Sequence, residues 1–175
     1  MRDMIPLIEP LIPALRRYAR SLLRDRASAD DLVQDCLERA LSRWHQRRQD
    51  GDARAWIFAI LHNLAMNRLK QTARRGPHLP LDAIGEEAFA QAAAQEDALL
   101  HRDLLGALAD LPEEQRSVLL LVSVEDLSYA EVARVLDIPI GTVMSRLSRA
   151  REKLLMAMEP DAAAFARGPN LRRVK

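Results

Sequence analysis

Hydroxyl-bearing and basic side chains recur at helical spacing in residues 141–154, "GTVMSRLSRAREKL". Steps of three and four residues bring such side chains to one side of a helix. Arg can donate two hydrogen bonds to guanine, and Ser and Thr hydroxyls can reach bases or phosphates, so this side suits the major groove of DNA. The predicted contact residues are Thr142, Ser145, Arg146, Arg149 and Lys153.

The preceding residues predict a short helix and a tight turn. Ser128 and Glu131 form the S-x-x-E pattern that caps a helix start, and Pro139 with Gly141 interrupts the helix that follows. Its predicted inner face consists of Tyr129, Val132, Ala133 and Leu136. A short helix, a turn and a second helix with a basic outer side form the helix-turn-helix pattern. The alternative is a solvated basic helix in an all-α bundle.

Three further helices are expected in the first 75 residues. One begins near Pro10 to Pro13 and runs to about Asp25, because proline is tolerated in a first turn. Ser28 is the expected N-cap of the second, whose apolar residues recur every three or four positions. The third spans about residues 53–75 and ends in basic side chains. No stretch alternates as a β-strand does, so the predicted fold is all-α, with two small helical domains joined by a flexible linker.

The net charge of +1 hides an uneven distribution. Residues 1–75 hold 15 basic and 9 acidic side chains, a balance of +6. Residues 76–110 hold one Arg and 7 acidic side chains, a balance of −6, and residues 111–175 hold 10 basic and 9 acidic ones, a balance of +1. Two basic regions around an acidic middle suggest two contacts with a polyanion.

Several classes of protein are not indicated. No run of eighteen apolar residues predicts a membrane span, and the N-terminus does not read as a signal peptide. The single cysteine, Cys36, excludes an internal disulfide and fits a reducing cytoplasm. The four His residues lack ligand spacing, and neither a nucleophile motif nor a phosphate-binding glycine loop occurs. We therefore expect no metal, no cofactor and no enzymatic activity.

Four segments resemble one known family in its order and spacing. "GTVMSRLSRAREKL" resembles the recognition helix of extracytoplasmic-function (ECF) sigma factors of bacterial RNA polymerase, and "LADLPEEQRSVLLL" resembles the helix before their helix-turn-helix. "SADDLVQDCLERAL" resembles their polymerase-binding helix, and "ARAWIFAILHNLAMNRLKQTARR" their promoter-melting helix. The similarity covers roughly residues 10–157.

The resemblance implies a role for each part of the chain. Its domains would be a polymerase-binding and −10-melting domain at 1–76, an acidic linker at 77–95, a helix-turn-helix domain reading the −35 element at 96–158 and a basic tail at 159–175. The partners would be core RNA polymerase (its β′ clamp helices and β flap), promoter DNA and an anti-sigma factor. Residues expected to meet polymerase are Asp31, Gln34, Asp35 and Glu38.

Melting of the −10 element requires a basic surface for the backbone and a place for an extruded base. Where many members of the family carry Asp, this chain has Asn67, whose amide can still contact a base edge. The expected −10 residues are Trp56, Asn63, Asn67, Arg68, Lys70, Arg74 and Arg75.

Two other functions compete with a sigma factor. One is a sigma-like decoy that binds an anti-sigma factor, for which the basic reading face would be unnecessary. The other is a stand-alone helix-turn-helix repressor, which would not need the acidic and basic helices of residues 1–75.

Overall fold

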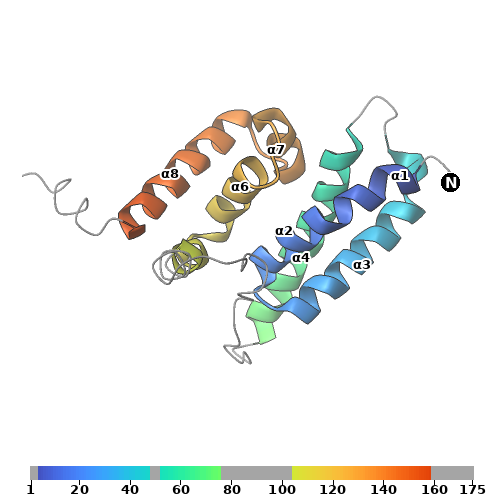
Figure 1. Ribbon diagram of the computed structural model, residues 1–175, viewed down its shortest axis with the longest axis horizontal. Coiled ribbons are helices and arrows are strands. Elements are labelled where there is room, and N and C mark those ends of the chain that lie inside the picture. The colour runs from blue at the N-terminus through green and yellow to red at the C-terminus, as the bar shows by residue number, and fades with distance from the viewer. Residues whose placement is uncertain (1–3, 48–51, 76–103, 159–175) are drawn as a thin grey trace, which may run out of the picture.

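The computed structural model describes residues 4–47, 52–75 and 104–158, and their regular structure is entirely helical. Figure 1 shows two groups of helices lying against each other, one from each half of the chain. We call the group within residues 4–75 the first body and the group within residues 104–158 the second body. The predicted all-α fold is confirmed. The predicted linker and tail lie outside the described residues.

Three prolines divide the start of the first body into short elements. Pro6, Pro10 and Pro13 each stand in the first two positions of an element, where the missing N–H costs no helical hydrogen bond. The elements of the first body are α1 (Ile5–Ile8), the 3-10 helix η1 (Glu9–Leu11), α2 (Ile12–Leu23), α3 (Arg26–Ser42), the 3-10 helix η2 (Trp44–Gln46) and α4 (Ala53–Arg75).

Asp25, rather than Ser28, caps the start of α3. The Asp25 carboxylate accepts a hydrogen bond from the backbone N–H of Ser28 at 2.8 Å, and contacts with Ser28 lower the pKa of this carboxyl group. The expectation that Ser28 is the N-cap is therefore wrong. Both residue types cap well, and the helix begins at the earlier one, so that Ser28 becomes its third residue.

The core of the first body lies between α2, α3 and α4. The rings of Tyr18 and Phe58 pack edge to face, with centroids 5.7 Å apart. Around them are side chains with at most 2% exposure, contributed by all three helices: Leu15, Leu22, Leu32, Val33, Cys36, Ile57 and Leu61. Each helix thus turns one side inward and leaves the opposite side available.

The second body contains the predicted helix-turn-helix. After a helical segment at residues 104–110 it comprises α6 (Glu113–Ser123), α7 (Tyr129–Leu136) and α8 (Ile140–Met158). The capping box is confirmed: Ser128 accepts from the Glu131 N–H, and the Glu131 carboxylate accepts from the Ser128 N–H at 2.7 Å. The predicted inner face is wrong at Tyr129, which is 37% exposed, whereas Val132 and Val135 are buried.

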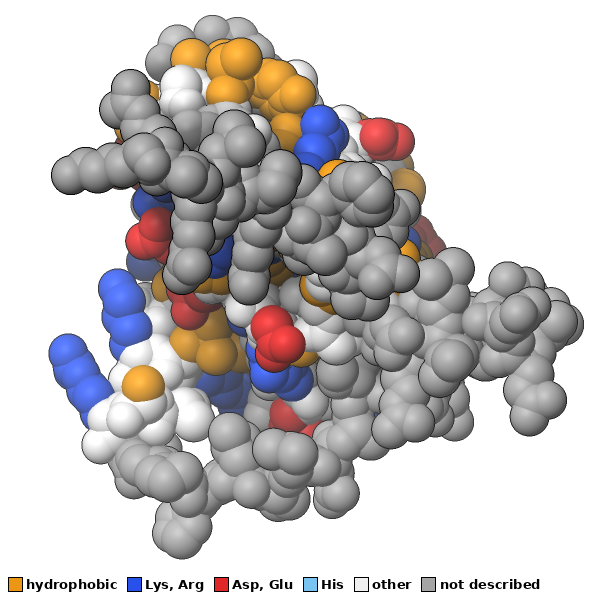
Figure 2. Space-filling model, turned by 90° about the vertical axis from the view of Figure 1, so that its left-hand side faces the viewer, with side chains coloured by type: hydrophobic (Ala, Val, Ile, Leu, Met, Phe, Trp, Pro, Cys, Tyr) orange, Lys and Arg blue, Asp and Glu red, His pale blue; other side chains and the backbone are white. Residues whose placement is uncertain are grey.

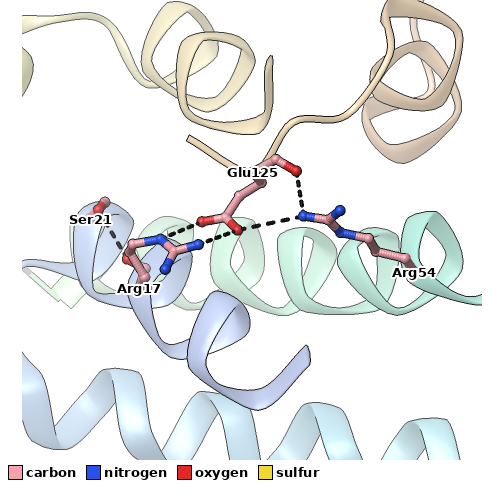
Figure 3. A network of polar contacts seen from close by, with 4 residues as sticks. All are labelled: Arg17, Ser21, Arg54 and Glu125. Carbon is pink, nitrogen blue, oxygen red and sulfur yellow. Dashed lines mark hydrogen bonds and ion pairs between the residues drawn. The ribbon is translucent and has the colours of Figure 1, made fainter. Parts of the chain in front are cut away.

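The two bodies share an interface made by α2 and α4 on one side and α6 and α7 on the other. Glu125 lies in the turn after α6, and its carboxylate accepts two hydrogen bonds from the Arg17 guanidinium, at 2.9 and 2.8 Å. Arg54 of α4 donates to the backbone oxygen of Glu125 and lies 3.9 Å from its carboxylate (Figure 3). Arg24 also donates across this interface, to the carbonyl of Ala109.

None of the helices in the described ranges has the length and apolar character needed to cross a membrane.

We predict that Ser128→Ala lowers the free energy of unfolding by about 1 kcal/mol, because one N–H at the start of α7 loses its acceptor and Glu131 loses its reciprocal partner. Urea unfolding followed by circular dichroism measures the change. Ser148→Ala is the control: Ser148 is exposed within α8, where alanine is the better helix former. Equal stability of Ser128→Ala and the unaltered chain would show that the cap contributes nothing.

Candidate nucleic-acid interface

The basic helix α8 is held by one apolar side. Val143, Leu147 and Ala150 are buried toward α6 and α7, which leaves the rest of its circumference accessible. Arg149 and Lys153, two of the residues predicted to contact DNA, are exposed. Thr142 and Ser145 are half-buried, and Ser145 donates to the Thr142 carbonyl at 3.1 Å.

Arg146 does not project freely from α8. Its guanidinium lies 2.6 Å from the carboxylate of Glu114 on α6, and its side chain is only 22% exposed. The pair fixes the direction of the Arg146 side chain, and contact with a base would require Arg146 to leave Glu114 or to use its remaining donors. The sequence gives no sign of this partner, 32 residues away along the chain.

A second exposed stripe on α8 was not predicted. Met144, Ser148 and Arg151 follow one another at steps of four and three residues, and Met144 is 54% exposed. This stripe lies on a different side of α8 from the predicted contact residues Arg149 and Lys153. The sequence could have indicated this stripe. Met144 and Ser148 directly follow the apolar residues Val143 and Leu147, and consecutive residues of a helix point in different directions.

Helix α4 carries an exposed polar stripe along its second half. Asn63, Asn67, Lys70 and Arg74 are all exposed and follow at steps of four, three and four residues, so they share one side of the helix. Figure 2 shows Lys and Arg side chains that project at the left-hand edge of that view. Amides able to contact base edges thus precede cations able to contact phosphates.

Arg68 lies beside this stripe but is engaged within the first body. Its guanidinium donates to the Ser28 carbonyl at 2.9 Å and lies 3.8 Å from the carboxylate of Asp31. These contacts tie α4 to the start of α3. The side chain of Arg75 lies outside the described residues.

Trp56 forms an aromatic pair near the start of α4. Its ring meets that of Trp44 edge to face at 5.9 Å, and both side chains are half-buried. The guanidinium of Arg47 lies over the Trp44 ring, 4.8 Å from its centroid. The pair therefore both packs and presents an aromatic surface next to a cation.

The predicted polymerase-binding side chains share the outer side of α3. Asp31 has 70% of its side chain exposed, and Gln34 donates to the Glu38 carboxylate at 3.1 Å. Asp35 and Glu38 also line an open surface hollow together with Arg39, Ser42 and Arg43.

His62 and Cys36 are turned inward. The imidazole Nδ1 of His62 lies 3.1 Å from the Tyr18 hydroxyl, and burial lowers the pKa of His62 to about 4. His62 is therefore neutral at physiological pH and does not add charge to the α4 surface. Burial raises the pKa of the Cys36 thiol to about 12, so this thiol stays protonated and inert.

Two protein-family models match the two bodies in chain order. The model described as "Sigma2 domain of PhyR" matches residues 8–62, and "Sigma-70, region 4" matches residues 101–154.

Curated relatives match most of the chain. The ECF RNA polymerase sigma factor EcfG of Rhodopseudomonas palustris is 34% identical over 152 residues, covering 87% of this chain and 83% of the relative. The ECF RNA polymerase sigma-E factor of Escherichia coli is 33% identical over 140 residues, covering 74% of this chain and 73% of the relative.

Among solved structures, the sigma factor RpoE of Bartonella quintana, in complex with the anti-sigma factor NepR, is similar with a TM-score of 0.78. It is 29% identical, and the match covers 92% of this chain and 99% of that chain.

We predict that the stability of the protein falls as the pH drops from about 6.5 to about 4, by up to about 3 kcal/mol from His62 alone. The sign follows because the folded state holds His62 with a lowered pKa, so the unfolded chain binds a proton first as the pH drops. His62→Gln should flatten this dependence in urea titrations at pH 7 and pH 5, whereas His45→Gln, at an exposed position, should not. Parallel pH dependences for all three proteins would refute the assignment.

Proposed function

This chain belongs to the extracytoplasmic-function family of RNA polymerase sigma factors, and from that premise we propose how its two bodies divide the work. The first body docks on core polymerase and opens the −10 element, and the second body reads the −35 element. The observation that carries this proposal is the presence of two separate exposed DNA-suited surfaces, on α4 and on α8, in a chain whose two bodies match a Sigma2 domain model over residues 8–62 and a Sigma-70 region 4 model over residues 101–154.

The outer side of α3 is our proposed polymerase contact. Asp31, Asp35 and Glu38 present carboxylates to solvent, where basic side chains of the β′ clamp helices could form charge-assisted hydrogen bonds. Support comes from the division of α3 into a fully apolar inner side and an acidic outer side. An acidic side is unsuited to DNA, so a protein partner is the fitting occupant.

The α4 stripe is our proposed −10 contact. Asn63 and Asn67 can pair with base edges of the melted strand, and Lys70 and Arg74 can neutralise its phosphates. The half-exposed Trp56 lies near the start of the same helix, where an aromatic face can stack on an unpaired base. In this proposal Arg68 acts indirectly, by holding α4 to α3 through Ser28 and Asp31.

The exposed side of α8 is our proposed −35 contact. Arg149 can form two hydrogen bonds with a guanine, and the ammonium group of the exposed Lys153 can contact a phosphate. Met144 lies on the other exposed stripe of α8, turned away from Lys153, and is not part of this proposed contact. Arg146 contributes once it turns from Glu114, and Thr142 and Ser145 supply hydroxyl groups.

We further propose control by an anti-sigma factor, cytoplasmic action beside the polymerase, and no catalytic step by this chain itself. The similar RpoE structure contains a sigma factor bound to the anti-sigma factor NepR, which supports the first point. A sigma-like decoy or a stand-alone repressor remains the alternative outcome of the experiment below.

Transcription in vitro tests the function. Core polymerase, the purified chain and a library of genomic DNA fragments should yield transcripts with defined start sites, and omission of the chain should abolish them. The chain alone should retard the same DNA poorly in a gel. Tight DNA binding without polymerase would instead identify a repressor, and association with an anti-sigma factor without any transcription would identify a decoy.

We predict that the double substitution Asp35→Lys with Glu38→Lys weakens binding to core polymerase at least about tenfold, because two attractive charges become repulsive. Fluorescence anisotropy of labelled chain titrated with core polymerase measures this. Glu9→Lys, an exposed acid of the same body outside α3, is the control. Unchanged polymerase affinity in the double variant would remove α3 from the contact.

We also predict that Arg149→Ala and Lys153→Ala have different effects on promoter use. Arg149→Ala should cost about 1–3 kcal/mol at promoters with the preferred −35 sequence and little elsewhere, whereas Lys153→Ala should weaken use of all −35-dependent promoters alike. Transcription from a panel of −35 variants distinguishes the two. Uniform weakening by both variants would mean that Arg149 contacts only phosphate.

A further inference from the structure

The ion pair between Arg146 and Glu114 is asymmetric in its access to solvent. Nitrogen and oxygen of the pair lie 2.6 Å apart, yet the Arg146 side chain is 22% exposed and the Glu114 side chain is 68% exposed. A molecule that approaches this part of α8 therefore meets the carboxylate before it meets the guanidinium. By contrast, Arg149 and Lys153, which follow Arg146 at steps of three and four residues, are exposed.

Both members of the pair stand on helices that pack together within the second body. Arg146 lies in the first half of α8, directly before the buried Leu147, and the first half of a recognition helix is the part that meets base edges. Glu114 lies in the first turn of α6, which continues into the buried Val118 and Leu121. The helix N-terminus stabilises a carboxylate, so Glu114 keeps a favourable position even when Arg146 moves away.

Separation of this pair is inexpensive, because the exposed carboxylate of Glu114 can be hydrated in place and ion pairs open to solvent contribute little to stability. A guanine offers the guanidinium of Arg146 two acceptors in the major groove, which is enough to draw it from a single carboxylate. Other bases do not offer two acceptors in that geometry. At such bases the guanidinium keeps its contact with Glu114.

The chain without this carboxylate would behave differently. An unpaired Arg146 could contact any nearby phosphate, and phosphate contacts add affinity without sequence information. The carboxylate of Glu114 also repels the DNA backbone by its own charge. Specificity is the difference between two affinities, so a group that weakens binding to the wrong sequence increases it.

We propose that Glu114 is a specificity-determining residue of the −35 contact, which withholds Arg146 from DNA except where a guanine captures the guanidinium. This inference rests on the proposed function for the role of α8. Glu114 acts through Arg146 and is therefore a positioning residue. It lowers the affinity for DNA in general and raises the preference for promoters that carry guanine opposite Arg146.

Competition among promoters tests this role. One promoter found by transcription in vitro is prepared with every single base-pair substitution in its −35 element. The pooled templates then compete for a limiting amount of holoenzyme, formed from core polymerase and the full chain. Sequencing of the transcripts gives the preference among the four base pairs at each position. With the unaltered chain, guanine should be preferred at a position where Arg146→Ala removes that preference.

Glu114→Gln should lower the guanine preference at this same position at least about threefold, because the templates without guanine there become better used. In the Arg146→Ala background the same substitution should leave the preference unchanged. Asp110→Asn is the matched control, since it removes another exposed carboxylate of the second body, four residues earlier, and should alter no preference. Urea unfolding should show that Glu114→Gln is folded and nearly as stable as the unaltered chain.

Three results would overturn the role of Glu114 and leave the proposed function standing. They are an unchanged preference at the Arg146-dependent position in Glu114→Gln, an equal loss of preference at every −35 position, and the absence of any guanine preference that Arg146→Ala removes. In each case the unaltered chain still directs transcription from defined start sites. Absence of such start sites with the unaltered chain would instead refute the proposed function, and with it the inference that rests on it.

Discussion

A carboxylate with almost no access to water sets the relation between the two halves of this protein. Glu125 can occupy its position only because Arg17 and Arg54 reach it from helices of the first body. Most surface ion pairs contribute little to stability, but a desolvated pair with two aligned hydrogen bonds is specific about geometry. That specificity chooses which faces of the two bodies meet, and therefore which faces remain available to partners.

Each of the helices α3, α4 and α8 uses one side for packing and leaves the other side for recognition of partners. In α3 the apolar side holds the core and the opposite side is acidic, whereas in α4 the opposite side offers amides followed by cations. In α8 one exposed side offers the cations Arg149 and Lys153, and a separate exposed stripe carries Met144. Since each body needs all its apolar sides to form a core, specificity toward polymerase or DNA can vary on the outer sides with little effect on the fold.

Local features of this protein were predictable, and long-range contacts were not. The capping box of Ser128 and the extent of α4 follow from residues a few positions apart. The sequence alone does not distinguish Asp25 from Ser28 as the N-cap of α3, because both residue types are good N-caps. The position at which the packed helix begins selects Asp25. The pairing of Arg146 with Glu114 and the enclosure of Glu125 join residues far apart in sequence, and charge pattern alone cannot indicate which acid meets which arginine.

Arg24 illustrates a conflict between backbone and side chain. It ends α2 in the left-handed conformation, with φ of 57°, a position that glycine occupies with the least strain. Glycine would have no guanidinium to donate to the Ala109 carbonyl of the other body. The substitution Arg24→Gly would thus relax the end of the helix and at the same time remove a contact between the bodies. One substitution would therefore stabilise the end of α2 and weaken the contact between the two bodies.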